Sequence, residues 1–157
     1  DGGQSARFSA PRVYDLVLTW DGIGHHIELK KVSGKKGTWP ISGLQSHQEA
    51  GLLSAARCGA MAWVGVFWQV QLGKKAQKTK RWAGQESHEG CYFVQIHQVI
   101  EQRDEQFQTG LTLDWFVDNG VFVPEIFEHG VTTPEGRPLR LWDPRPITDP
   151  AHRFGGL

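Results

Sequence analysis

The segment DLVLTWDGIGHHIELK, residues 15–30, is the most informative part of the chain, because two alternating apolar and polar patterns flank the dipeptide Asp21-Gly22. Asp-Gly favours a two-residue type I′ turn, in which both central residues need positive φ angles. Alternation with a period of two is typical of strands that bury one face. The sequence therefore predicts a hairpin made of strands 13–20 and 25–32.

The register of this hairpin brings two acidic side chains together. With Trp20 opposite Ile23, Asp15 lies directly opposite Glu28, and Lys30 points to the same face as Glu28. Facing like charges destabilise a sheet, whereas Mg²⁺ would bind such a pair as oxygen ligands. Lys30 would then steady an attacking water or an anionic phosphate. The alternative is a solvated face on which the two acids meet without a ligand.

The opposite face of the hairpin is apolar, and we expect it to pack on the core. His25 and His26 are expected to be neighbouring surface residues rather than ligands, because Mg²⁺ prefers oxygen. The apolar set comprises Tyr14, Leu16, Leu18, Ile27 and Leu29.

Strands and helices alternate in the rest of the chain. The apolar run 60–72, rich in Val, Phe and Trp, predicts a buried central strand, and residues 91–96 a further strand. Ser42 followed by Gln45 resembles a capping box, which predicts a helix that ends near Arg57 at the stop signal Gly59. Two further helices are predicted at 97–107 and 113–118. This order predicts an α/β fold with a mixed β-sheet flanked by helices.

Length and composition indicate one domain. The chain has 157 residues, and its 39% hydrophobic content excludes a disordered protein. We expect the domain to occupy residues 1–128 and a Pro/Gly-rich tail, 129–157, to pack on it or extend from it. The two cysteines lack metal-ligand spacing, and no signal peptide or membrane span is evident. A reducing, cytoplasmic location is therefore expected.

Positive charge is clustered although the net charge is zero. The clusters suggest a surface that binds a polyanion, and the alternative is that they are two solvated loops. Trp39 lies in the loop next to the acidic pair and is a candidate base-stacking residue, whereas Trp63, Trp68 and Trp115 are expected in the core. The candidate phosphate contacts are Arg7, Arg12, Lys35, Lys36, Lys74, Lys75, Lys78, Lys80 and Arg81.

Gln48 is a polar residue on an apolar helix face. It lies four residues from both Leu44 and Leu52, which share one face at helical spacing. A buried amide needs hydrogen-bond partners. Either a carboxylate cluster on the adjacent sheet or the backbone would supply them.

These residues together resemble a known family. Asp15 followed by Glu28-Leu29-Lys30 is similar to the motif of the PD-(D/E)xK nucleases. Arg7-Phe8-Ser9, His47-Gln48 and the strand 62–68 resemble the RecU-type Holliday junction resolvases in order and spacing. The resemblance covers roughly residues 5–127, so it implies that residues 1–128 form a nuclease domain.

The resemblance implies a homodimeric endonuclease that cuts four-way DNA junctions with Mg²⁺, for which Mn²⁺ can substitute, and with no organic cofactor. Asp15, Glu28 and the Leu29 carbonyl would bind the metal, Lys30 would be the catalytic lysine and Gln48 would orient the site. Two alternatives remain. One is another PD-(D/E)xK endonuclease, nicking or restriction-like, and the other is a non-catalytic DNA-binding module with the same fold.

Overall fold

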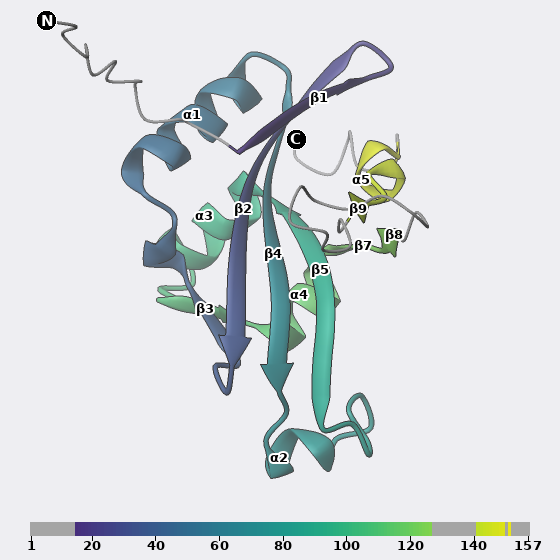
Figure 1. Cartoon of the computed structure of the whole chain (residues 1–157). Helices are drawn as coiled ribbons and strands as arrows, with labels where there is room; N and C mark the ends of the chain where they lie inside the picture. The colour runs from purple at the N-terminus through teal and green to yellow at the C-terminus, as the bar shows by residue number, and fades with distance from the viewer. Residues whose placement is uncertain (1–14, 127–140, 150, 152–157) are drawn as a thin grey trace, which may run out of the picture.

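The structure is a computed structural model that describes residues 15–126, 141–149 and 151. Its centre is a five-stranded sheet with the order β1-β2-β4-β5-β7 (Figure 1). β2 and β4 pair in parallel and the other neighbours pair antiparallel, so the sheet is mixed as predicted. The strands of this sheet are β1 Leu16–Trp20, β2 Ile23–Gly34, β4 Met61–Gln71, β5 Ser87–Gln95 and β7 Val121–Val123. Two smaller sheets pair β3 Thr38–Pro40 with β6 Gly110–Thr112, and β8 Glu125–Ile126 with β9 Leu141–Trp142.

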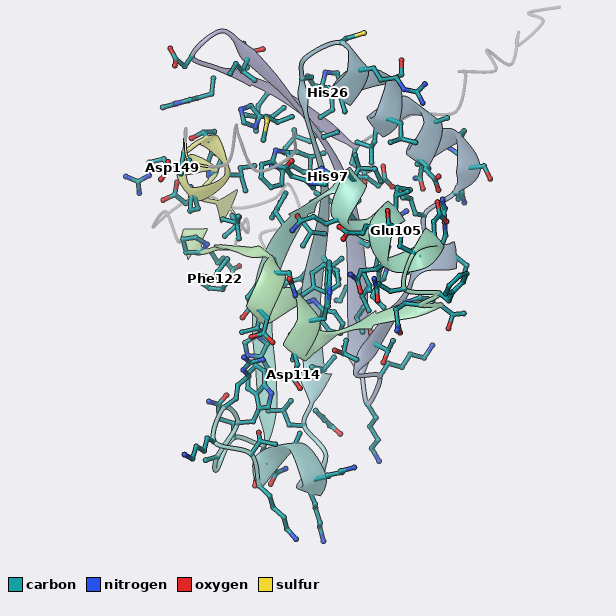
Figure 2. The ribbon with its side chains drawn as sticks, turned by 180° about the vertical axis from the view of Figure 1, so that it is seen from behind. His26, His97, Glu105, Asp114, Phe122 and Asp149 are labelled. Atoms are coloured by element: carbon teal, nitrogen blue, oxygen red, sulfur yellow. The ribbon has the colours of Figure 1, made fainter. Side chains whose placement is uncertain are left out.

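Helices lie on both faces of the sheet. One face packs against α1, α3 and α4 around the larger hydrophobic cluster, and Figure 2 shows α3 and α4 in front of the strands. The other face holds a smaller cluster, to which α5 contributes the buried Ile147. The helices are α1 Ser46–Arg57, α2 Lys74–Gln77, α3 Ile96–Asp104, α4 Leu113–Asn119 and α5 Arg145–Thr148, with a 3-10 turn η1 at Ile41–Gly43.

The hairpin prediction is confirmed. Asp21 and Gly22 have φ angles of 50° and 74°, as a type I′ turn requires. The paired residues of β1 and β2 follow the predicted register, from Trp20 opposite Ile23 at the turn outward. β2 then continues to Gly34, well beyond the end of β1, because it also pairs with β4 along ten positions.

The prediction that the apolar face of the hairpin packs on the core is confirmed only in part, for Ile27 and Leu18, and the opposite face is buried as well. Leu16 and Leu29 are 47% and 41% exposed, whereas Glu28 is 2% exposed. α1 packs on the face that carries Glu28, so the acidic residue lies under a helix and not on a solvated surface. Of the apolar set, Ile27 alone among its described members is fully buried. Tyr14 lies outside the described residues.

Helix α1 begins later than predicted. Gln45, and not Ser42, is the N-cap, and it forms a capping box with Gln48. Ser42 lies in the 3-10 turn that precedes the helix. The predicted stop at Gly59 is confirmed, since its φ of +86° suits glycine.

Several boundaries differ by a few residues. β5 begins at Ser87, four residues before the prediction, and α3 ends at Asp104. The predicted loop after β4 contains the single-turn helix α2, and the loop after β2 contains β3. The short strands β3, β6 and β7 were too brief for a periodic pattern to indicate them.

The C-terminal tail is described in part. Residues 127–140 lie outside the described structure, while β9 pairs with β8 and Asp143 N–H donates to the Pro124 carbonyl at 3.0 Å. Together with the buried Ile147, these contacts hold the segment 143–148 against the sheet. No helix in the described part of the chain has the length and apolar content that crossing a membrane requires.

The two cysteines differ in accessibility, which gives a direct test of the fold. Cys58 is exposed at the end of α1, whereas Cys91 is buried in β5 and burial raises the pKa of its thiol to about 12. We expect a thiol reagent at pH 8 to modify one cysteine in the native protein and two in denaturant. Mass spectrometry of the labelled peptides would identify Cys58; rapid native labelling of Cys91 would contradict the fold.

Candidate functional site

Glu28 is the central residue of the candidate site. It lies in the middle of β2 beneath the N-terminal turn of α1. Its Oε1 accepts hydrogen bonds from Lys30 Nζ, at 2.8 Å, and from Gln48 Nε2. Its Oε2 is buried and has no hydrogen-bond partner within the described structure. A buried carboxylate oxygen without a partner is costly, and such an atom points to a ligand that completes its coordination.

The amide of Gln48 links this carboxylate to the start of α1. Its Oε1 accepts from the Gln45 backbone N–H at 3.0 Å and from Lys30 Nζ at 2.9 Å. Because Oε1 makes both of these contacts, the other end of the Gln48 amide, Nε2, faces Glu28. The capping box therefore determines the orientation of the amide, and the amide in turn positions Lys30 and Glu28 against each other.

Asp15 lies beside the same strand, one residue beyond the last regular pair of the hairpin. Its N–H donates to the Ile27 carbonyl at 3.0 Å, and its Oδ2 accepts from Leu29 N–H at 2.8 Å. The N–H and carbonyl of one strand residue point to the same side, so the Leu29 carbonyl also faces this edge of β2. The predicted ligands Asp15, Glu28 and Leu29 thus come from adjacent positions of one hairpin.

Electrostatics of the site favour a bound cation. Burial raises the pKa of the Glu28 carboxyl, the hydrogen bond and charge of Lys30 lower it, and the negative charge of Asp15 raises it. His47 has a smaller lowering effect. Lys30 pairs with Glu28 while the charge of Asp15 opposes its ionisation, so an added positive charge would stabilise the ionised form of Glu28.

The donor set determines which metal fits. Within residues 15–126, 141–149 and 151, no three His, Cys, Asp or Glu side chains form a metal cluster. The available ligands are the carboxylates of Asp15 and Glu28 and the Leu29 carbonyl, all of them oxygen. Mg²⁺ and Mn²⁺ are bound by few carboxylates together with water and phosphate, so these residues fit such an ion and do not fit Zn²⁺.

A groove begins at Lys30 and follows β2. Its volume is about 400 Å³, and Lys30, Lys31 and Lys36 lie along it. Trp39 forms part of its wall but is buried, with its ring edge-on to Phe116 at 6.1 Å. The prediction of Trp39 as a base-stacking residue is therefore wrong, because its ring belongs to the core.

The two lysine clusters lie at one end of the sheet. The loop after β2 and helix α2 are both at the lower end in Figure 1. Lys35 lines a hollow together with the Gly73–Ala76 region of the chain, which places the loops side by side. The exposed lysines of this end are Lys35, Lys36, Lys74, Lys75, Lys78 and Lys80.

Arg81 differs from its lysine neighbours. It forms ion pairs with Asp114 and Asp118 of α4, and these hydrogen bonds raise its pKa. It therefore attaches the basic loop to the domain, as does the buried Trp82, whose Nε1 donates to Asp114 Oδ1 at 2.7 Å. Arg7 and Arg12 lie outside the described residues.

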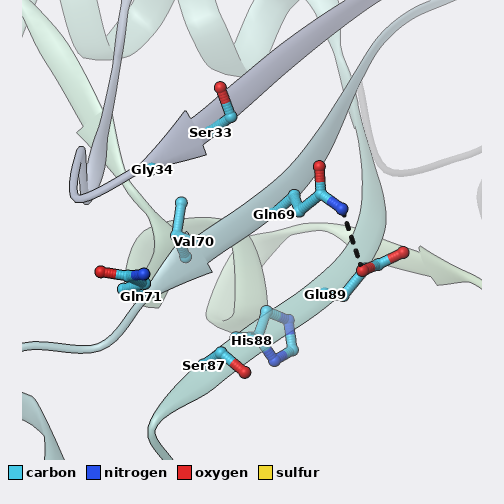
Figure 3. A pocket seen from close by; sticks show the side chains of 8 residues that line it. All are labelled: Ser33, Gly34, Gln69, Val70, Gln71, Ser87, His88 and Glu89. Carbon is cyan, nitrogen blue, oxygen red and sulfur yellow. Dashed lines mark hydrogen bonds between the residues drawn. The ribbon is translucent and has the colours of Figure 1, made fainter.

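Two other features of the sheet lie apart from this site. His25 is buried and its Nδ1 accepts from Trp63 Nε1 at 3.2 Å, so the prediction of a surface histidine is wrong. A hollow of about 330 Å³ at the ends of β4 and β5 is lined by polar residues, among which Gln69 donates to Glu89 (Figure 3). These two side chains project from the face opposite to Glu28.

The structure brings together Asp15, Glu28, Lys30 and Gln48, as the sequence predicts. Sequence reasoning placed Gln45 at the third position of a capping box with Ser42, whereas Gln45 is itself the N-cap and the Gln-x-x-Gln spacing to Gln48 forms the box. No protein-family model and no curated protein matches this chain. The fold and the site define an α/β protein in which a hairpin next to a parallel strand pair carries an Asp and a Glu-x-Lys sequence.

Proposed function

We propose that this chain is a PD-(D/E)xK nuclease, similar to RecU, that cuts four-way DNA junctions by metal-dependent phosphodiester hydrolysis. The observation that carries the proposal is the buried Glu28 carboxylate. One of its oxygens is shared by Lys30 and Gln48 and the other has no partner among the described residues, while Asp15 lies near it. A buried acid held in this way is typical of a functional site.

The residues of the site divide into two roles. Asp15, Glu28 and the Leu29 carbonyl would hold Mg²⁺ or Mn²⁺, which when bound polarises a phosphate and lowers the pKa of a water. Lys30 is anchored by Glu28 and Gln48, so its ammonium is positioned at the start of the groove. There it can donate to a phosphate oxygen and offset the charge that develops during hydrolysis.

The lysine-rich end of the sheet supports DNA as the substrate. Contacts of lysine with phosphate position a duplex without reading its sequence, as a structure-selective enzyme requires. Symmetric cleavage of a junction needs two sites, so the proposal includes a homodimer. The hairpin provides a candidate surface for it, because Leu16, Val17 and Trp20 are each about half exposed.

Incubation with a labelled synthetic four-way junction tests the function. We expect paired nicks at symmetric positions with Mg²⁺ or Mn²⁺ and no nicks in EDTA, because the acids need a cation to act. A linear duplex of the same sequence is the control substrate. Equal cutting of the duplex would support a different endonuclease of this superfamily, and binding without any nick would indicate a non-catalytic DNA-binding module.

A further inference from the structure

Among the described residues, no strand pairs with the edge of β2 next to the candidate site along about half of its length. β1 pairs with β2 between Ile23 and Ile27, and no other described strand pairs with this edge. The backbone groups of Lys31 and Ser33 therefore point away from β4, like those of Leu29. Backbone N–H groups along such an edge can donate to phosphate oxygens.

The groove beside this edge has the charge that a polyanion requires. Three lysines, Lys30, Lys31 and Lys36, line it and no carboxylate does. Three other hollows of the described surface each include an acid, namely Glu89, Asp118 or Asp114. Because Lys30 belongs both to the groove and to the candidate site, the groove begins where the site lies.

The groove is built on rigid elements. Its wall includes Trp39 and Pro40 of β3, which pairs with β6, and the buried Trp39 ring packs on Phe116. Gly43 leaves room for that ring, since a Cβ at this position would lie 3.3 Å from Trp39 Nε1. A wall held in this way keeps its shape when a ligand binds, which reduces the entropic cost of ordering side chains on binding.

We propose that the DNA strand to be cut lies along the edge of β2 from Leu29 to Gly34, with Lys31 and Lys36 on its phosphates to one side of the scissile bond. The inference rests on the proposed function and adds the path of the strand. Leu29 to Gly34 spans about 17 Å at 3.3 Å per residue, which is long enough to contact more than one phosphate of a strand.

The test combines protein variants with single uncharged phosphates. Junctions carrying one methylphosphonate at successive positions from the branch point are titrated with wild type, Lys31→Ala and Lys36→Ala in Ca²⁺, and cut in Mg²⁺. We expect each variant to bind the unmodified junction about fivefold more weakly, as for one exposed ion pair. A methylphosphonate at one or two positions should weaken DNA binding by the wild type but leave the binding of each variant unchanged. All of these positions should lie on one side of the cut.

Arg57→Ala, an exposed residue at the end of α1, is the matched control and should bind as the wild type does. Unchanged unfolding midpoints check that the variants fold. The proposed path would be overturned if the protein substitution and the methylphosphonate weakened binding additively at every position. It would also be overturned if the sensitive phosphates were spread equally over both sides of the cut. If the wild type never cuts junctions but the variants lose sensitivity to the expected phosphates, the nuclease function would be overturned and the proposed DNA path would be retained.

Discussion

Glu28→Gln is expected to lower the rate of junction cleavage in Mg²⁺ by about 1,000-fold, since a metal ligand contributes several kcal/mol to the transition state. The substitution keeps the shape of the side chain, and its oxygen can still accept from Lys30. It removes the charge for which Lys30 and an ion would compete. Single-turnover cleavage at saturating enzyme measures the effect, and binding in Ca²⁺ shows whether the junction still docks.

Two further variants isolate the charge from the fold. In Asp15→Asn the amide oxygen can still accept from Leu29 N–H, so a comparable loss of cleavage would be due to the missing charge. Glu49→Gln is the matched control, because Glu49 also lies near the start of α1 but pairs with Arg103 of α3. It should cleave at the wild-type rate. Wild-type rates in Glu28→Gln would refute this site.

Phe116→Ala is expected to reduce the free energy of unfolding by about 3–5 kcal/mol, the usual cost of removing a buried aromatic ring. Phe116 is 0% exposed, and its ring meets the rings of Trp39, Trp68 and Trp115 edge-on at 6.1, 5.5 and 5.2 Å. The substitution therefore removes packing from three large neighbours. Urea unfolding followed by Trp fluorescence measures the change.

Phe107→Ala is the control for this loss. Phe107 is 84% exposed, so its truncation should change the free energy of unfolding by less than about 0.5 kcal/mol. Similar losses in the two variants would show that α4 does not pack as described. Since Trp39 also forms the groove wall, we further expect folded Phe116→Ala protein to bind junction DNA more weakly than the wild type.

Local rules predicted the hairpin and the grouping of its acids. Asp21-Gly22 determines the turn, the turn determines the register, and the register places Asp15 next to the Glu28–Lys30 segment. Each step involves residues close in the chain, so no knowledge of distant packing was needed. Helical spacing likewise placed Gln48 on the buried face of α1.

The surroundings of those residues depended on contacts between distant segments. Alternation shows that a strand has two different faces but not which of them a helix will cover, so the sequence left open whether the face of Glu28 is solvated, and the structure shows Glu28 buried. Arg81 appears in sequence as one of a basic cluster, yet aspartates more than thirty residues away neutralise it. The same applies to Trp39, whose ring is enclosed by Phe116.

Local sequence was thus enough to predict the hairpin, its register and the candidate site residues, because turn chemistry and strand periodicity act over a few residues. The burial of Glu28, its second oxygen without a partner in the described part of the chain, and the groove beside β2 all depend on tertiary contacts. Burial and charge pairing depend on which surfaces the completed sheet and its helices bring together, and that information lies in no single segment.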